Sequence, residues 1–317
     1  MTLDNILEEI QNAQSILILT HESPDGDAIG SSLAMNLALK ELGKKPDVII
    51  REFPRTFEFL PGSKDAKKDT DIEKYDLIIT LDCTDLKRLV GNEYAEKAKK
   101  IINIDHHGSN AMYGDINFIN SVAPACCEIL VGMLEYFNIP IDVNIGSCIL
   151  AGIITDTGGF KYSSVTAETF EFTAELLRKG VNVSEIYSKV LETRTKSSFE
   201  LLKRSMNRLK LLEDGKVAFT YITKEDAEEV NAEPGDQEGI VENGRSIEGV
   251  KISVLLKQRE DENYYKVSMR SNGNINVSDI CYVFGGGGHP KAAGALVQGT
   301  VEEVKDKILK EIRKVLN

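Results

Sequence analysis

The sequence predicts an α/β protein with a parallel sheet in its N-terminal domain and a smaller α/β domain at its C-terminal end. Short apolar runs alternate with helical patterns over the first half of the chain, which is typical of parallel strands joined by crossover helices. After about residue 185 this alternation stops, and a charged helical segment leads into a second group of strands. With 317 residues, the chain is long enough for two domains of ordinary size.

Four apolar runs are the predicted strands of the first sheet, at residues 16–21, 45–50, 75–82 and 98–105. Helical spacing of apolar residues predicts helices over residues 28–43, 124–137 and 144–153. The N-terminal residues 1–14 form an acidic amphipathic pattern, which differs from the basic start and apolar centre of a signal peptide.

The C-terminal part contains three further predicted strands and a last helix, at residues 216–222, 250–258, 264–271 and 300–316. The charged helical segment 185–211 precedes them and contains the predicted domain boundary. We therefore expect a first domain over residues 1–185, a helical linker over residues 186–210 and a second domain over residues 211–317.

The charge balance limits the partners of the protein. Lysine and arginine number 38 and aspartate and glutamate number 50, which gives a net charge of −12. Proteins that wrap long nucleic acids usually present a basic surface, so we expect no long nucleic acid as a partner. Apolar runs are far shorter than the ~20 residues of a membrane span, and no targeting segment is visible. We therefore expect a cytoplasmic protein without a membrane partner.

Residues that commonly bind metal ions follow the predicted strands of the first sheet. They are His21, Asp25 and Asp27 after the first strand, Asp82 after the third, and Asp105, His106 and His107 after the fourth. Asp156 ends the apolar stretch 148–156. Because ligands of open α/β sheets bind beyond the carboxyl ends of the strands, we expect these side chains to meet in one crevice.

This combination of carboxylates and imidazoles suits Mn²⁺, Fe²⁺ or Zn²⁺ better than calcium, and the number of ligands fits two ions better than one. Two ions that share an aspartate are typical of phosphoryl hydrolysis, and Asp82 is the candidate for the shared residue. Each residue also has a purely structural interpretation. Asp25, Asp27 and Asp82 are typical turn or helix-cap residues, and His21 could be an ordinary buried imidazole. Their occurrence at consecutive strand ends favours the metal site.

Four motifs in the sequence resemble those of the DHH phosphoesterases. They are "HESPDGDAIGS", "LDCTD", "DHH" and "ITDTGGF". The later segment "GGGGHPKAAG", at residues 285–294, is similar to the signature of the DHH-associated domain. The resemblance covers nearly the whole chain in the expected order, and its length and wording are most similar to the nanoRNase/pAp-phosphatase branch of the family.

The resemblance implies two divalent metal ions, with Mn²⁺ favoured and Mg²⁺ as the alternative. His21 and Asp25 would hold one ion, Asp27, His106 and Asp156 would hold the other, and Asp82 would be shared. Asp105 would orient an imidazole, as ligating histidines usually require. His107 would face the substrate phosphate and, with Asp82, be a catalytic residue.

The C-terminal domain contains the predicted substrate-binding residues. Gly286, Gly287 and Gly288 precede His289 and an alanine-rich stretch that we expect to be helical, an arrangement in which backbone N–H groups and a helix start converge on an anion. The alternative is a flexible loop. The resemblance implies that Arg270 and Ser271 bind substrate phosphate. Arg194 is a further candidate, with an exposed helix residue as its alternative.

The resemblance implies a two-metal phosphoesterase with its active site in the cleft between the two domains. Its substrates would be short oligoribonucleotides, cleaved to nucleoside 5′-monophosphates, and 3′-phosphoadenosine 5′-phosphate (pAp), cleaved to AMP and phosphate. The alternatives are a phosphodiesterase for linear or cyclic signalling dinucleotides, an inorganic pyrophosphatase and a non-catalytic nucleotide-binding regulator. A homodimer is compatible with the sequence.

Overall fold

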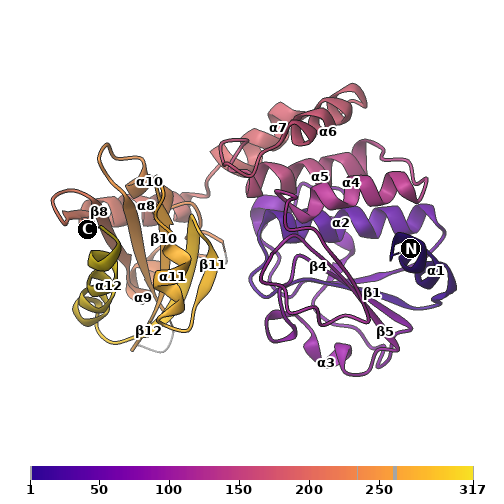
Figure 1. Cartoon of the computed structure of the whole chain (residues 1–317), viewed down its shortest axis with the longest axis horizontal. Helices are drawn as coiled ribbons and strands as arrows, with labels where there is room; N and C mark the ends of the chain where they lie inside the picture. Colours follow the sequence, from indigo (N-terminus) through magenta and orange to yellow (C-terminus); the bar gives the residue numbers. More distant parts are fainter. Residues whose placement is uncertain (1, 234, 260–262, 317) are drawn as a thin grey trace. The chain divides into compact units, whose positions relative to one another are not determined.

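The computed structural model describes residues 2–233, 235–259 and 263–316, and the chain divides into two compact units (Figure 1). The first unit is Met1–Thr193 and the second is Arg194–Asn317. The segment expected as a linker, residues 186–210, is divided between these units. Its first residues belong to the first unit, whereas its main helix, α8 (Lys196–Arg208), packs on strand β8 (Val217–Ile222) of the second.

The first unit contains a six-stranded parallel sheet, which confirms the predicted architecture. The strands follow the order β3-β2-β1-β4-β5-β6. Strands β1 and β4 are therefore the two central strands, with β2 and β3 beside β1 and with β5 and β6 beside β4. Their bounds are β1 Ile16–Leu19, β2 Asp47–Ile49, β3 Ala66–Lys67, β4 Leu77–Leu81, β5 Lys100–Asp105 and β6 Ile116–Ile119. The central strands β1 and β4 are buried along their whole length, as continuous apolar runs in parallel sheets usually are.

Helices cover the two faces of this sheet unequally. Helix α2 packs on β1, β2 and β4, α4 and α5 pack against α2, and α6 and α7 lie farther out (Figure 1). The other face is covered by short segments, in which Tyr75, Leu89 and Ala95 pack on Leu17 and Ile78. The helix bounds are α1 Thr2–Asn12, α2 Gly26–Glu41, α3 Asn92–Ala95, α4 Cys126–Tyr136, α5 Val143–Asp156, α6 Ala167–Arg178 and α7 Val183–Tyr187.

The second unit contains a mixed sheet with the order β11-β12-β10-β9-β8-β7. Among its strand pairs in the described residues, only β8–β9 is parallel. The bounds of its other strands are β7 Lys210–Leu212, β9 Ile252–Gln258, β10 Tyr264–Ser271, β11 Gly287–His289 and β12 Ala292–Gln298. The helices after α8 are α9 Lys224–Glu229, α10 Val241–Arg245, α11 Val277–Tyr282 and α12 Val301–Leu316.

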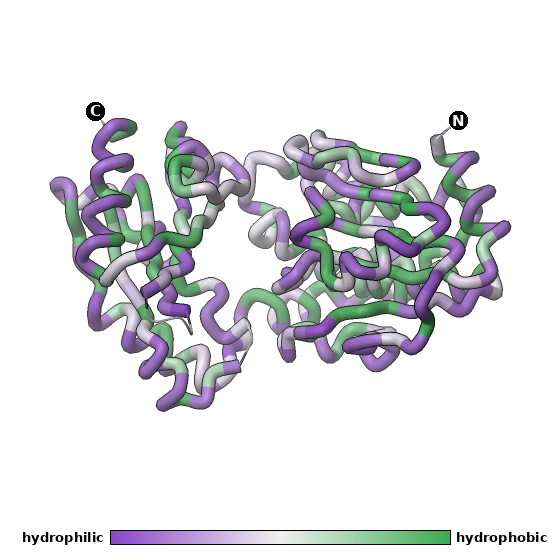
Figure 2. The backbone as a smooth tube through the Cα atoms, turned by 90° about the horizontal axis from the view of Figure 1, so that it is seen from below, coloured by the Kyte–Doolittle hydropathy of each residue, from purple (hydrophilic) through white to green (hydrophobic). Residues whose placement is uncertain are grey.

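Both faces of this second sheet carry helices. Helices α11 and α12 cover one face, where Ile280 and Ile308 pack on Val254 and Val267. In Figure 2 the C-terminal helix alternates hydrophilic and hydrophobic residues along its length, as expected for a helix with one buried stripe. None of the helices among the described residues combines the length and the apolar character that a membrane crossing requires.

The alanine-rich stretch after His289 is a strand, so the prediction of a helix there was wrong. Residues 292–298 form β12, which pairs with β11 on one side and with β10 on the other. Alanine has a high helix propensity, but here the stretch pairs with a strand on each side. Ala293 and Ala295 are buried against the core, and tertiary packing therefore overrides the local preference.

Candidate active site

The predicted metal ligands lie at the carboxyl ends of three adjacent strands. His21 follows β1, Asp82 follows β4, and His106 follows β5. Because β4 lies between β1 and β5, the topology places Asp82 between the two histidines. The order of strands also reverses between β1 and β4, which is where open parallel sheets form their ligand crevices.

The Asp82 carboxylate faces one imidazole with each of its oxygens. Asp82 Oδ2 lies 3.7 Å from His21 Nε2, and Asp82 Oδ1 lies 3.5 Å from His106 Nε2. Asp82 has a left-handed backbone conformation with φ of 54°, which aspartate and asparagine tolerate better than most residues. The side chain is 2% exposed. Each oxygen of this buried carboxylate is thus close to a different imidazole.

Both of these histidines have the orientation of metal ligands. The Nδ1–H of His21 donates to the Glu22 carbonyl oxygen at 2.8 Å, and that of His106 donates to the Ala123 carbonyl oxygen at 3.2 Å. A carbonyl oxygen only accepts, so Nδ1 carries the proton and Nε2 is left to face the carboxylates. Ligating histidines are commonly fixed in this way through their other ring nitrogen.

The remaining carboxylates complete two groups of ligands around Asp82. His21 Nε2 lies 4.0 Å from Asp25 Oδ1, whereas His106 Nε2 lies 3.3 Å from Asp156 Oδ2 and 3.8 Å from Asp27 Oδ2. In each group the ligand atoms lie within 4.8 Å of one another. His21, Asp25 and Asp82 form one such group, and Asp27, His106 and Asp156 form another.

Three helix ends position these carboxylates. Asp25 caps α2, where its Oδ1 accepts from the N–H groups of Asp27 and Ala28, as the capping interpretation predicts. Asp27 is fully buried and accepts from the first N–H groups of α4, those of Cys126 at 2.6 Å and Cys127 at 2.9 Å. Asp156 ends α5. The role of the α4 N–H groups could not be predicted, because backbone donors leave no signal in the sequence.

The residues present fit divalent metal ions. Asp82 Oδ1 is buried, and no donor among the described residues makes a well-aligned hydrogen bond to it. Four carboxylates and two imidazoles converge within a few ångströms, which is costly unless positive charge neutralises them. Oxygen and nitrogen ligands together match Mn²⁺, Fe²⁺ or Zn²⁺.

Perturbed pKa values reflect the same concentration of negative charge. Burial lowers the pKa of His21, but the attraction of Asp82 and Asp25 outweighs burial and raises this pKa to about 9. Burial also lowers the pKa of His106, and the attraction of Asp156 and Asp82 raises it to about 12. Burial, followed by the charge of Asp82, raises the pKa of Asp27 to about 7. The site therefore retains protons where metal ions are absent.

This retention of protons predicts how stability depends on pH. His21 and Asp27 have higher pKa values in the folded chain than the usual 6.5 and 3.8, so the metal-free folded state binds more protons than the unfolded state. Its free energy of unfolding should then fall as pH rises, through about 7 for Asp27 and about 9 for His21. Metal binding displaces these protons, so stabilisation by Mn²⁺ should grow with pH. Thermal unfolding with EDTA and with Mn²⁺ between about pH 6 and pH 9 measures both trends; a constant gap between the two curves would contradict the prediction.

Asp105 supports the two histidines that follow it. Its Oδ1 accepts from the backbone N–H of His106 at 2.7 Å and from His107 Nδ1 at 2.8 Å. Its Oδ2 accepts from Asn110 Nδ2 at 2.7 Å. Asn110 was missed from the sequence, because an asparagine in a turn has many structural explanations. His107 Nδ1 is also 3.4 Å from Asp82 Oδ1, which brings His107 to the edge of the same cluster.

We expect Asn110→Ala to weaken catalysis without unfolding the protein. The variant removes the donor to Asp105 and loosens the turn that positions His106 and His107. Residues that support metal ligands typically contribute about 10–100-fold to metal affinity or activity, and a loss in this range is expected. Kinetics and a Mn²⁺ titration measure it. Asn182→Ala, which removes the side chain that caps α7 in the same unit, is the control and should keep full activity.

In the second unit, the predicted substrate residues separate into two kinds. Arg270 and His289 lie in one row across β10, β12 and β11, since both pair with Ala292. Paired residues point to the same face of a sheet, so these two side chains share a face. Arg270 Nε donates to Glu242 Oε1 at 2.7 Å.

Ser271 and Arg194 are engaged within the protein. Ser271 follows Arg270 in the strand, so it points to the opposite face, where it is buried and its hydroxyl donates to the Ile275 carbonyl oxygen. Arg194 donates to the carbonyl oxygens of Glu238 and Gly239, at 3.1 and 3.0 Å. Arg194 is thus neither an exposed helix residue nor a residue with an unused guanidinium.

The glycine run is an edge of the sheet rather than a flexible loop. A Cβ atom at Gly286 would lie 2.1 Å from the Gly294 carbonyl oxygen, and one at Gly288 would lie 2.6 Å from the Ala292 carbonyl oxygen. Both positions therefore require glycine for close strand pairing. A Cβ at Gly287 would meet nothing within 4 Å, and the same holds for Gly285, so these two positions leave open space for a ligand.

Comparison with known proteins identifies the family. A model of the DHH family N-terminal domain matches residues 15–153, and a model of the DHHA1 domain matches residues 214–317. The bifunctional oligoribonuclease and PAP phosphatase NrnA of Thermus thermophilus is 32% identical over 305 residues, which cover 95% of this chain and 90% of that protein. The chain belongs to the DHH phosphoesterase family.

Two further proteins match nearly the full length of the chain. A crystal structure of an exopolyphosphatase-related protein from Bacteroides fragilis has a TM-score of 0.88 and 32% identity, and the match covers 99% of this chain and 96% of that one. The cyclic-di-AMP phosphodiesterase PdeA of Listeria monocytogenes is 26% identical, and the match covers 96% of this chain but 48% of that protein.

Proposed function

We propose that this DHH phosphoesterase hydrolyses short oligoribonucleotides to nucleoside 5′-monophosphates and pAp to AMP and phosphate. The names of its relatives support the substrate class, since the Thermus protein and a Bacillus subtilis relative at 25% identity are both bifunctional oligoribonucleases and PAP phosphatases. The observation that carries the chemistry is the Asp82 carboxylate, whose two oxygens face His21 and His106 in opposite groups of ligands.

Six residues would hold two divalent ions in this proposal. They are His21 and Asp25 for one ion, Asp27, His106 and Asp156 for the other, and Asp82 for both. Bound ions of this kind supply a water of lowered pKa and neutralise charge on phosphoryl oxygens. We favour Mn²⁺ over Mg²⁺, because imidazole ligands suit manganese better.

His107 is the candidate proton donor to the leaving oxygen. Its Nδ1–H is held by Asp105 at 2.8 Å, which fixes the plane of the ring. Burial lowers the pKa of His107, but the hydrogen bond to Asp105 and the charge of Asp82 raise it above its usual value. A proton retained at Nε2 suits donation to an oxygen that leaves phosphorus.

The second unit would bind the rest of the substrate. Arg270 and His289 present cationic and donor groups on one face of its sheet, and Gly287 leaves room beside them. A guanidinium suits a phosphate because it donates two parallel hydrogen bonds. We also assign the protein to the cytoplasm, where short RNA fragments arise.

The experiment that tests the proposal supplies Mn²⁺ and three separate substrates: a 5′-phosphorylated RNA dinucleotide, pAp and pyrophosphate. Mononucleotide from the dinucleotide or phosphate from pAp, with pyrophosphate intact, is the expected result. Cleavage of pyrophosphate alone would overturn the proposal in favour of a pyrophosphatase. Tight nucleotide binding without turnover of any substrate would indicate a regulator.

A signalling dinucleotide is the second candidate substrate. The similarity to PdeA supports it, since that protein is a cyclic-di-AMP phosphodiesterase and nearly all of this chain aligns with part of it. The rates at which the protein cleaves the linear and the cyclic form of the same dinucleotide distinguish the two functions. Faster cleavage of the linear form supports the oligoribonuclease, whereas faster cleavage of the cyclic form supports the signalling enzyme.

A further inference from the structure

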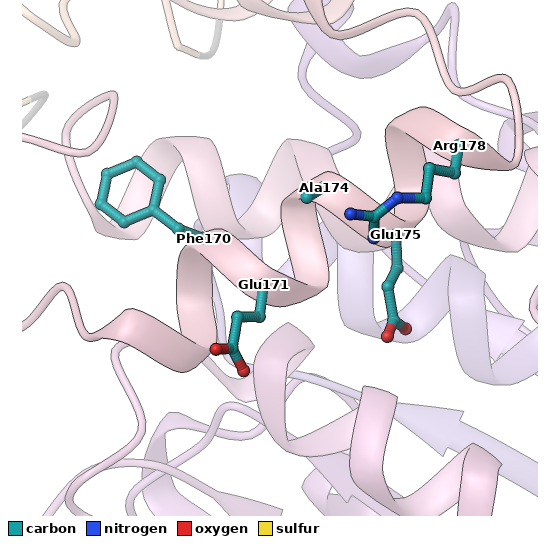
Figure 3. A pocket seen from close by; sticks show the side chains of 5 residues that line it. All are labelled: Phe170, Glu171, Ala174, Glu175 and Arg178. Carbon is teal, nitrogen blue, oxygen red and sulfur yellow. The ribbon is translucent and has the colours of Figure 1, made fainter.

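A polar network lies beside the candidate metal ligands of the first unit. It differs from the hollow on helix α6, which is lined by five residues of that helix, none of them a candidate ligand (Figure 3). In the network, the segment that follows His107 contributes three hydrogen-bond donors to the turn that follows Asp82. These donors belong to Asn110, Ala111 and Tyr113.

The three donors hold two successive carbonyl groups of the turn. The hydroxyl of Tyr113 and Nδ2 of Asn110 both donate to the Cys83 carbonyl oxygen, each at 3.1 Å. The backbone N–H of Ala111 donates to the Thr84 carbonyl oxygen at 2.8 Å. One short segment after β5 therefore fixes the turn after β4.

This turn begins at a residue with an unfavourable backbone conformation. Asp82 has a φ of 54°, in the left-handed region that residues other than glycine seldom adopt. Such a conformation persists only where the surrounding structure determines it. The N–H of Asp82 donates to the Ile104 carbonyl oxygen at 3.1 Å, which fixes the side of Asp82 that faces the sheet. The contacts to Cys83 fix the other side.

The hydroxyl of Tyr113 is the donor in its contact with Cys83, because a carbonyl oxygen only accepts. The same hydroxyl donates to Thr80 Oγ1 at 2.8 Å, so its proton is shared between the two acceptors. Burial raises the pKa of Tyr113 above its usual value, and the hydroxyl therefore keeps its proton.

Asparagine side chains extend the network across β5 and β6. Asn103 is fully buried on β5, and its Nδ2 donates to Asn110 Oδ1 at 2.8 Å and to Asn117 Oδ1 at 3.1 Å. Asn117 in turn binds both the N–H and the carbonyl oxygen of Gly114. Asn110 also donates to Asp105. One network therefore holds together the turns that carry the ligands after β4 and after β5.

We propose that Tyr113 is a positioning residue of the metal site, which holds the Cys83 carbonyl and thereby the Asp82 carboxylate between the two groups of ligands. Its hydroxyl acts through Asp82 and not through contact with an ion or with substrate. The inference rests on the proposed two-metal site and adds to it a residue that is not itself a ligand.

Tyr113→Phe tests the proposal, because it removes only this hydroxyl. The Mn²⁺ affinity of the full chain, measured by titration calorimetry, should fall by about tenfold, at the lower end of what residues that support metal ligands contribute. Hydrolysis of the RNA dinucleotide at low Mn²⁺ concentration should slow as well, and saturating Mn²⁺ should restore the rate. Loss of a catalytic group would not be restored in this way. Unchanged Mn²⁺ affinity would overturn the proposal.

Tyr75→Phe is the matched control. Tyr75 is buried, and its hydroxyl lies 2.8 Å from the Thr70 hydroxyl and donates to Asp47 Oδ2 at 2.7 Å. It precedes β4, at the end of this strand opposite to Asp82. The control variant loses a similar pair of hydrogen bonds, which thermal unfolding in EDTA measures, and should keep its Mn²⁺ affinity. Equal losses of affinity in the two variants would indicate a general effect on stability and overturn the proposal.

A double variant tests whether Tyr113 and Asn110 act on the same carbonyl. Either donor alone can still hold the Cys83 oxygen, whereas the double variant removes both. Tyr113→Phe combined with Asn110→Ala should therefore lower Mn²⁺ affinity by about threefold or more beyond the product of the two single losses. Independent losses would contradict the route through Cys83.

Mn²⁺ binding also separates this inference from the proposed function. If the wild-type chain binds Mn²⁺ and Tyr113→Phe weakens that binding, the inference holds even where none of the proposed substrates is hydrolysed. A wild-type chain that binds no Mn²⁺ would overturn both.

Discussion

Replacing Asp82 by asparagine should lower kcat/KM for dinucleotide hydrolysis by more than about 100-fold, beyond the usual effect of losing a residue that only supports a ligand. Asparagine keeps the size of the side chain and also tolerates the left-handed backbone at this position, where φ is 54°. The fold should therefore survive, while the neutral amide no longer offers two anionic oxygens to the groups around His21 and His106.

Kinetics and the measured Mn²⁺ content of the purified variant provide the readouts. Asp142→Asn is a matched control, because Asp142 caps the first turn of α5, far along that helix from Asp156, and asparagine caps equally well. The control should retain normal activity. Near-normal activity and metal content in the Asp82 variant would refute its assignment as the shared ligand.

Gly152→Ala should disturb the site without changing any ligand. A Cβ atom at Gly152 would lie 2.3 Å from Cys127 Sγ and 2.7 Å from Asp27 Oδ1. The Asp27 carboxylate would have to leave the N–H groups of α4 that now hold it. We expect Mn²⁺ affinity to fall by about 10–100-fold. Overpacking should also lower the free energy of unfolding by about 1–3 kcal/mol.

Two further variants separate the causes. Gly132→Ala on α4 is the control, since a Cβ there meets nothing within 4 Å, and it should be neutral or stabilising by up to about 1 kcal/mol. Adding Cys127→Ala to Gly152→Ala removes the sulfur atom and should recover much of the stability. Metal affinity should stay low, because the contact with Asp27 persists. Full metal affinity in Gly152→Ala would show that Asp27 is not held as described.

The strands and helices of the first sheet were predictable because each carries its own signal. The apolar runs that became β1, β2, β4 and β5 are too short for helices and are bounded by turn residues. The edge strand β6 was missed, because its residues are all half-buried and form no clear pattern. The strand β12 was mistaken for a helix, because alanine has a high helix propensity. Pairing with the neighbouring strand β10 outweighs this local preference.

The candidate metal ligands were also predictable, since residue type and position at strand ends are both written in the sequence. Their supports were not. Asn110 and the N–H groups of Cys126 and Cys127 act through contacts between residues that are distant along the chain or carry no chemical label. The same is true of Gly152, whose importance lies in the space that it leaves for Asp27.

The sequence by itself determined the alternation of strands and helices, the ligand types and the family motifs, because these depend on local composition and spacing. Tertiary structure alone decided that β4 lies between β1 and β5, and hence that Asp82 faces two imidazoles at once. It also decided that Ser271 turns away from Arg270 and that Phe170 and Leu177 remain exposed. Strand order and burial depend on contacts between distant segments, and no local pattern encodes them.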